Sequence, residues 1–118
     1  MKSAKIFSAL VSLALPLSLF ASPAITSVSL NKTTCDVLSP PTVTVAATGA
    51  DWVRAEVWGD YTPNGDHGAV HVYLSKSGNN WTGTLPVDRA GAMSVRFTAG
   101  DDATGETATS RVYSYKTT

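Results

Sequence analysis

Charged residues are scarce in this sequence. Of 118 residues, nine are Lys or Arg and nine are Asp or Glu, so the formal net charge is zero. Two of the lysines lie in the N-terminal segment described below, which leaves seven basic residues against nine acidic ones in the rest of the chain. A nucleic-acid binder needs a basic face that displaces counterions from phosphates. The charge balance therefore argues against nucleic acid as a partner.

Cysteine is almost absent, since Cys35 is the single one in the sequence. An intrachain disulfide is therefore excluded. Cys35 lies well past the apolar N-terminal segment, unlike the lipid-modified first residue of a lipoprotein. Two alternatives are left for it: a buried thiol or an intermolecular cross-link. Free cysteines are usually buried, so burial is the favoured alternative.

Motifs that carry chemistry are missing as well. The sequence shows no Gly-rich phosphate loop, no nucleophile elbow and no pair of carboxylates in a predicted cleft. The two histidines, His67 and His71, are too few for a zinc site of three or four ligands. A nucleophilic pair of Cys35 with His71 would need an activating geometry that the sequence does not show. The sequence thus predicts a protein that is not an enzyme and that needs no cofactor.

Long apolar runs are limited to the N-terminus. Lys2 and Lys5 precede residues 6–20, which are apolar apart from serines and one proline. This run is short for a bilayer-spanning helix, and small residues follow it. The pattern predicts a secretory signal peptide, with an uncleaved anchor as the alternative. No later segment is long and apolar enough to span a bilayer.

Two cleavage positions fit the predicted signal peptide. Cleavage could follow Ala21, or it could follow Ala24, where small residues precede the bond. The predicted division is a signal peptide over residues 1–24 and one domain over residues 25–118. We therefore expect a secreted protein, in the periplasm, at the cell surface or outside the cell.

After the predicted leader, apolar positions alternate with polar ones, and turn residues recur about every ten positions. No window has a helical period of useful length. Valine, threonine and aromatic residues dominate the alternating runs, as a pleated, half-buried surface favours. These features predict an all-β, two-layer sandwich of about seven antiparallel strands. The expected strands are Ile25–Asn31, Thr42–Thr48, Trp52–Trp58, Ala69–Ser75, Trp81–Val87, Met93–Ala99 and Thr107–Tyr115.

The alternation also predicts which side chains fill the core. Trp81 is expected inside, as sandwich cores commonly hold a tryptophan. The other inward positions are expected to be Val43, Val45, Ala47, Val53, Ala55, Val57, Val70, Val72, Leu74, Gly83, Leu85, Met93, Val95, Phe97 and Ala99.

The run Trp81-Thr82-Gly83-Thr84 and the later segment 91–105 form two motifs that resemble the bacterial Ig-like modules of surface and secreted proteins. Those modules carry a W-T-G-T strand followed by a G-x-x-x-V-x-V-x-A-x-D-x-A-G-N strand and turn. The first motif is matched by residues 81–84, and Glu106 stands where the family often has Asn. The resemblance implies an Ig-like Greek-key fold and a role in adhesion, spacing or carbohydrate recognition, without catalytic residues. The second motif is matched approximately by Gly91, Val95, Phe97, Ala99, Asp101 or Asp102, Ala103 and Gly105.

One outer face is predicted to gather large aromatic and basic side chains. If Val53, Ala55 and Val57 point inward, the residues between them point outward. In an Ig-like order the expected strand 93–99 lies beside this strand, and the expected strand 107–115 lies beside strand 93–99. Exposed aromatics are uncommon unless they bind something, and Trp, Tyr and Arg dominate interface energetics. The alternative is a strand register that is wrong by one residue. The expected ligand-binding residues are Trp52, Arg54, Trp58, Arg96, Arg111, Tyr113 and Tyr115, with Glu56 beside them.

Acidic residues are expected to gather at one end of the sandwich. Asp51, Asp101 and Asp102 form a weak calcium candidate, because calcium takes six to eight oxygen ligands and such loops can supply them. The favoured alternative is that these side chains cap turns by bonding their own backbone. We therefore predict no metal site.

The sequence predicts a secreted binding module that recognises a carbohydrate or a cell-surface protein through the aromatic face. The alternative is a structural or accessory subunit of a surface assembly, acting through a strand edge or by self-association.

Overall fold

The computed structural model describes residues 22–59, 70–87 and 90–118. The predicted signal peptide up to Ala21 lies outside these residues, as does His67. The described part of the chain is all-β, and none of its segments forms a helix long and apolar enough to cross a membrane. The prediction of an all-β chain is therefore confirmed.

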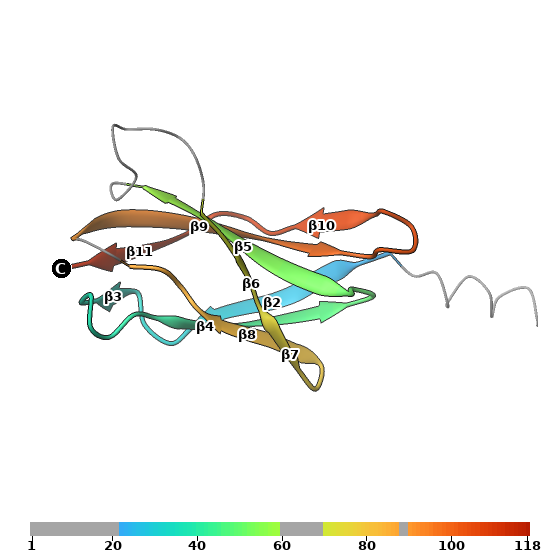
Figure 1. The fold of residues 1–118 in the computed structure, drawn as a ribbon, viewed down its shortest axis with the longest axis horizontal. Helices are drawn as coiled ribbons and strands as arrows, with labels where there is room; N and C mark the ends of the chain where they lie inside the picture. The colour runs from blue at the N-terminus through green and yellow to red at the C-terminus, as the bar shows by residue number, and fades with distance from the viewer. Residues whose placement is uncertain (1–21, 60–69, 88–89) are drawn as a thin grey trace, which may run out of the picture.

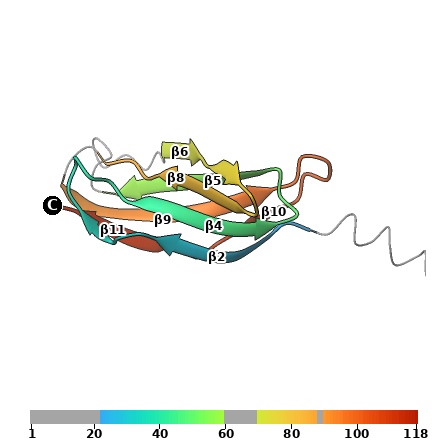
Figure 2. The same cartoon turned by 90° about the horizontal axis from the view of Figure 1, so that it is seen from below.

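The strands form two sheets, as Figures 1 and 2 show. The four-stranded sheet has the order β2-β4-β8-β7, and in Figure 2 its strands β2 and β4 lie in front of β9 and β11. The six-stranded sheet has the order β3-β11-β9-β5-β6, with β10 also paired to β9. All pairings are antiparallel except that of β3 with β11. The strand bounds are β2 Ala24–Leu30, β3 Thr34–Cys35, β4 Thr42–Thr48, β5 Trp52–Gly59, β6 Val70–Tyr73, β7 Ser75–Ser77, β8 Asn80–Thr84, β9 Gly91–Gly100, β10 Thr107–Thr109 and β11 Tyr113–Thr117.

A single core lies between the two sheets, and it consists largely of the predicted inward residues. Trp81 is 6% exposed, as expected for a core tryptophan. Ala47 and Val72 are partly buried against the core, whereas Val70 at the edge is 39% exposed. Of the residues predicted to point inward, only Val70 at this edge is exposed. The buried predicted residues are Val43, Val45, Val53, Ala55, Val57, Leu74, Leu85, Met93, Val95, Phe97 and Ala99.

The expected strand Ala69–Ser75 divides between the two sheets. Its first part, β6, pairs with β5, and β7 then pairs with β8 in the other sheet. Leu74 lies at the crossing: its amide donates to the Val53 carbonyl at 2.8 Å, and its side chain is buried in the core. The single predicted strand was therefore wrong, because the chain changes sheets without any proline or glycine to mark the change.

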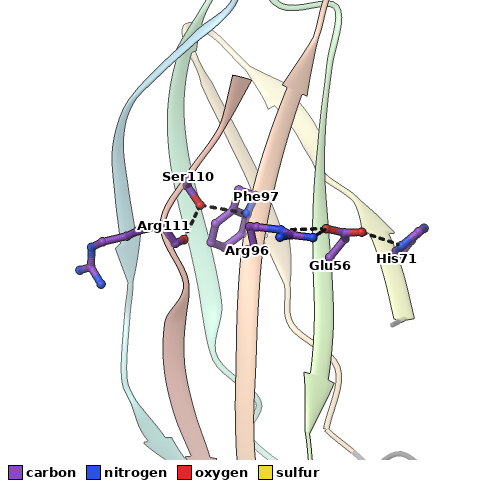
Figure 3. Close-up of polar contacts among 6 residues, drawn as sticks. All are labelled: Glu56, His71, Arg96, Phe97, Ser110 and Arg111. Atoms are coloured by element: carbon purple, nitrogen blue, oxygen red, sulfur yellow. Dashed lines mark hydrogen bonds and ion pairs between the residues drawn. The ribbon is translucent and has the colours of Figure 1, made fainter. Parts of the chain in front are cut away.

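The expected strand Thr107–Tyr115 is also divided, by an extra residue. Thr109 lies opposite Thr98 and Tyr113 lies opposite Val95, so three residues of one strand face two of the other. Ser110 occupies this bulge: its hydroxyl accepts a hydrogen bond from the Phe97 amide at 3.0 Å and donates to the Arg111 carbonyl at 2.7 Å, as Figure 3 shows. One inserted residue reverses which side chains face inward.

The bulge corrects the predicted orientation of two tyrosines. Tyr115 is 2% exposed, and its hydroxyl donates to the Pro86 carbonyl at 2.7 Å. Tyr113 is partly buried and packs edge-to-face on the core residue Phe97, with ring centroids 6.0 Å apart. Both tyrosines therefore point into the sandwich, and their expected place on the outer face was wrong.

The short strand β3 was not predicted. Its two residues pair with the end of β11, where the backbone amide of Lys116 donates to the Thr33 carbonyl at 2.8 Å. Cys35 is buried, with its Sγ atom 3.9 Å from Thr117 Oγ1. The favoured alternative for this cysteine, a buried thiol, is thus confirmed.

A candidate binding face on the six-stranded sheet

Two neighbouring strands of the six-stranded sheet, β5 and β9, carry four of the seven predicted binding residues on one outer face. The β5–β9 register places Trp52 opposite Gly100, Arg54 opposite Thr98, and Trp58 opposite Ser94. Directly paired residues project from the same side of a sheet. The buried residues of β5 alternate with these positions, so this side faces away from the core. We call this surface the aromatic face; it comprises Trp52, Arg54, Glu56, Trp58, His71, Tyr73 and Arg96.

Trp52 is half-buried because it covers a glycine of the next strand. Its six-membered ring lies against Gly100, where a Cβ atom would collide with it. Its indole N–H donates to Asp102 Oδ1 at 3.1 Å, and its ring meets Tyr73 edge-to-face at 6.0 Å. These contacts hold the indole in one orientation at the end of the face.

Arg54 lies next to the Trp52 ring and opposite Tyr73, and within the described ranges no hydrogen bond to its guanidinium is found. Its Cζ atom is 5.5 Å from the centroid of the Trp52 ring, and Tyr73 is opposite it on β6. The Nε atom of Arg54 is buried and makes no hydrogen bond. A buried donor without a partner costs stability, because its bond to water has been lost.

Glu56 joins the middle of the aromatic face into a ladder across β6, β5 and β9. Its Oε1 accepts from Arg96 Nη2 at 2.6 Å and from Nε at 3.0 Å, while its Oε2 lies 3.2 Å from His71 Nε2 (Figure 3). The hydrogen bonds from Arg96 lower the pKa of Glu56; the charges of Arg96, Arg54 and His71 act in the same direction, and burial opposes them. Glu56 is therefore held as a carboxylate, with both oxygens engaged.

Trp58 lies at the other end of the face and is half-buried. The guanidinium of Arg96, which already binds Glu56, is 5.7 Å from the Trp58 ring centroid. The two tryptophans thus differ in their neighbours: one arginine is paired with a carboxylate and the other is not. The sequence-based prediction expected both tryptophans to be exposed. In the structure both are half-buried.

Arg111 is not part of the aromatic face. Its Cζ atom lies 3.9 Å from the centroid of the Tyr113 ring, and its Nη1 donates to the Val112 carbonyl at 3.2 Å. Figure 3 shows this side chain directed away from the ladder of Glu56 and Arg96. The bulge that turns Tyr113 inward thus separates Arg111 from the other predicted residues.

Tyr73 is the residue of this face that sequence reasoning missed. It is 63% exposed, and no other described aromatic residue is as exposed. Its position between the inward Val72 and Leu74 indicated an outward side chain. The missing information was the sheet: Tyr73 joins Trp52 and Arg54 because β6 pairs with β5.

The three calcium candidates act as hydrogen-bond acceptors, Asp101 within its own turn and Asp51 and Asp102 between the two neighbouring loops. Asp51 accepts from the Asp102 amide at 2.7 Å, and Asp101 accepts from the Ala103 amide at 2.9 Å. Asp102 accepts from the indole of Trp52, as described above. Within the described ranges, no three His, Cys, Asp or Glu residues are grouped so that they could hold a metal ion.

The chain matches no protein-family model, no curated protein and no solved structure. What the protein does must therefore be inferred from its own residues and geometry.

Proposed function

We propose that this protein is a secreted, non-enzymatic binding module that recognises a carbohydrate or a cell-surface partner through the aromatic face. One observation carries the proposal: β5, β6 and β9 place Trp52, Tyr73 and Trp58 on one surface with two arginines. Trp, Tyr and Arg are the residues that most often dominate binding energy at interfaces.

An Ig-like Greek-key arrangement of the strands is part of this proposal. The order β2-β4-β8-β7 would correspond to strands A, B, E and D. The order β3-β11-β9-β5-β6 would correspond to A′, G, F, C and C′. The parallel pairing of β3 with β11 also supports this assignment. The aromatic face would then be the C′–C–F surface of such a module.

A carbohydrate is the preferred partner because aromatic rings alternate with polar groups on this face. Flat rings pack against the apolar faces of sugars, while charged and hydroxyl groups bond sugar hydroxyls. The ring of Tyr73 is largely accessible, and the half-buried Trp52 adjoins it at an angle of 67° between the ring planes. These two rings form a corner rather than a flat platform. A corner of this kind suits a ring-shaped ligand better than a flat protein surface.

Glycan-array binding of the purified protein tests the proposal. Tyr73→Ala should weaken binding by about 2 kcal/mol or more, as expected when a central aromatic anchor is lost. Its melting temperature should stay close to that of the wild type, because the side chain is largely exposed. Leu38→Ala is a matched control, since Leu38 is 92% exposed and lies outside the face. A wild-type protein that binds no glycan would contradict a carbohydrate as the partner, and full glycan binding by Tyr73→Ala would contradict the aromatic face as the binding site.

A second candidate function is a structural or accessory role in a surface assembly. It is favoured by a hollow of about 390 Å³ between β2 and the segment that joins β10 to β11. Strand β3 joins this sheet by pairing with the last residues of β11, and addition of a strand from another chain is a recurring mode of assembly for such sheets. Concentration-dependent oligomers that are insensitive to sugar would favour this role. Ultracentrifugation with and without the glycan mixture distinguishes the two functions.

A further inference from the structure

Arg54 and Arg96 lie on the same face but in different electrostatic surroundings. Arg96 donates two hydrogen bonds to one oxygen of Glu56, so its charge is compensated. Arg54 has no carboxylate within 4 Å among the described residues, and its buried Nε atom has no partner. The aromatic face therefore carries one uncompensated positive charge, and it lies at the end that holds Trp52 and Tyr73.

Among the described residues, the carboxylates near Arg54 already have other partners. Both oxygens of Glu56 are engaged, by Arg96 and by His71. Asp102 accepts the indole N–H of Trp52, and Asp51 accepts the amide of Asp102. Each of these acids would have to give up an existing contact in order to reach Arg54.

The surroundings of Arg54 fit a ligand that brings both a ring and a negative charge. Tyr73 lies directly opposite Arg54 in the β5–β6 ladder, and its ring is largely accessible. The centroid of the Trp52 ring lies 5.5 Å from Cζ of the same guanidinium. A guanidinium binds a carboxylate with two parallel hydrogen bonds, which add strength and fix orientation. A ligand on Tyr73 could place such a carboxylate against Arg54.

We propose that the aromatic face binds an acidic sugar, a hexuronate, with its ring packed on Tyr73 and its carboxylate paired with Arg54. This inference rests on the proposed function and names the class of saccharide. Only the end of the face at Arg54 would bind the acidic unit. At the other end, Trp58 lies beside Arg96, whose charge is compensated by Glu56, and uncharged sugar units of the same saccharide would lie there.

The experiment compares one oligosaccharide in two chemical forms. A short oligohexuronate is the acidic probe, and the same oligosaccharide with its carboxyl groups reduced to alcohols is the neutral probe. Binding of both to the wild type, Arg54→Gln and Arg111→Gln is measured by calorimetry. Arg111→Gln is the matched control, because Arg111 also lies over an aromatic ring but outside the face. Thermal melts of each variant verify that it is folded.

The wild type should bind the acidic form at least about tenfold more tightly than the neutral form, as expected for a charge-assisted hydrogen bond. Arg54→Gln should lose this preference and bind both forms alike, whereas Arg111→Gln should keep it. If Arg54→Gln fails to fold, Tyr73→Ala should weaken binding to both forms of the sugar.

Three results would overturn the inference. Equal binding of the acidic and neutral forms by the wild type would refute it while leaving a carbohydrate-binding function intact. A preference that survives in Arg54→Gln would do the same. An oligoglutamate of equal charge that binds as tightly as the sugar would identify charge alone, not a sugar, as the ligand feature. Binding to neither sugar form nor to any glycan of the array would refute the proposed function itself.

Discussion

At the scale of single residues, Trp52 combines a structural role with a place on the proposed binding face. It covers Gly100, bonds Asp102 and borders the unpaired Arg54. A glycine within a strand leaves backbone uncovered, and an aromatic ring on the next strand can shield it. Trp52 is therefore part of the structure even if its outer edge contacts a ligand. Trp81, in contrast, is a core residue only.

We predict that Gly100→Ala destabilises the protein through its contact with Trp52. The new methyl group would collide with the indole, which costs about 1–3 kcal/mol when neighbours must shift. Trp52→Ala removes the collision, so the double variant should lose less stability than the sum of the two single variants. Urea denaturation of the four proteins measures this coupling.

Gly83→Ala combined with Trp52→Ala is the control for this cycle. Gly83 lies on β8 in the other sheet, where a methyl group would press on the flexible end of Leu74. These two substitutions share no contact, so their effects should add. Additive behaviour of the Gly100 and Trp52 pair would show that the indole does not depend on the glycine.

At the scale of elements, the aromatic face depends on which strands are neighbours. The sequence indicated that inward and outward side chains alternate along β5 and along β9. It correctly predicted that four residues lie on the same side of the sheet: Trp52, Arg54, Trp58 and Arg96. It could not indicate that β6 pairs with β5 while β7, which follows it directly, pairs with β8 in the other sheet. It could not locate the one-residue bulge at Ser110 either, because serine is common in regular strands and in turns alike.

The ladder of His71, Glu56 and Arg96 predicts a particular dependence of stability on pH. The pKa of Glu56 is lower in the folded protein than its ordinary value of 4.5, chiefly because Arg96 bonds it. The ionised carboxylate therefore stabilises the fold above its ordinary pKa, and this contribution is lost as the pH falls through the lowered folded value. Glu56→Gln should lack this contribution at all pH values.

Chemical denaturation between about pH 6 and about pH 3 measures this effect. The wild type should be more stable than Glu56→Gln at the upper end, and the difference should shrink towards the lower end. In an Arg96→Gln background, the stability difference between Glu56 and Gln at position 56 should be smaller near pH 6. Arg96→Gln removes the main cause of the lowered pKa of Glu56. A constant difference across the whole range would contradict the assigned role of Glu56.

At the scale of the whole molecule, the first described residues are integrated into the sandwich. Pro23 is buried, Ala24 pairs with Thr48, and Ser22 Oγ donates to Glu106 Oε1 at 2.8 Å. The predicted cleavage after Ala24 would remove all three contacts, whereas cleavage after Ala21 would retain them. The start of β2 at Ala24 also falls one residue before the predicted domain boundary.

We therefore predict that exported protein begins at Ser22 and that the contacts of these residues contribute to stability. A chain that begins at Ile25 should be less stable by about 1 kcal/mol, the order expected for burial of a small apolar side chain. In a domain of this size that corresponds to a decrease in Tm of roughly 4–8 °C. Intact mass identifies the natural start, and thermal melts compare the two chains. Equal Tm values would show that residues 22–24 contribute nothing to the fold.

The sequence by itself determined the fold class, the core and the burial of most strand residues, because alternation with period two is a local property that each strand carries in its own residues. The positions of Val53, Phe97 and Trp81 follow from it directly. The tertiary structure alone decided how strands meet. Tyr115 became a core residue because one inserted residue at Ser110 reversed the alternation, and Tyr73 joined Arg54 because β6 pairs with β5. Pairing and register depend on residues far apart in the chain, so no local pattern contains them.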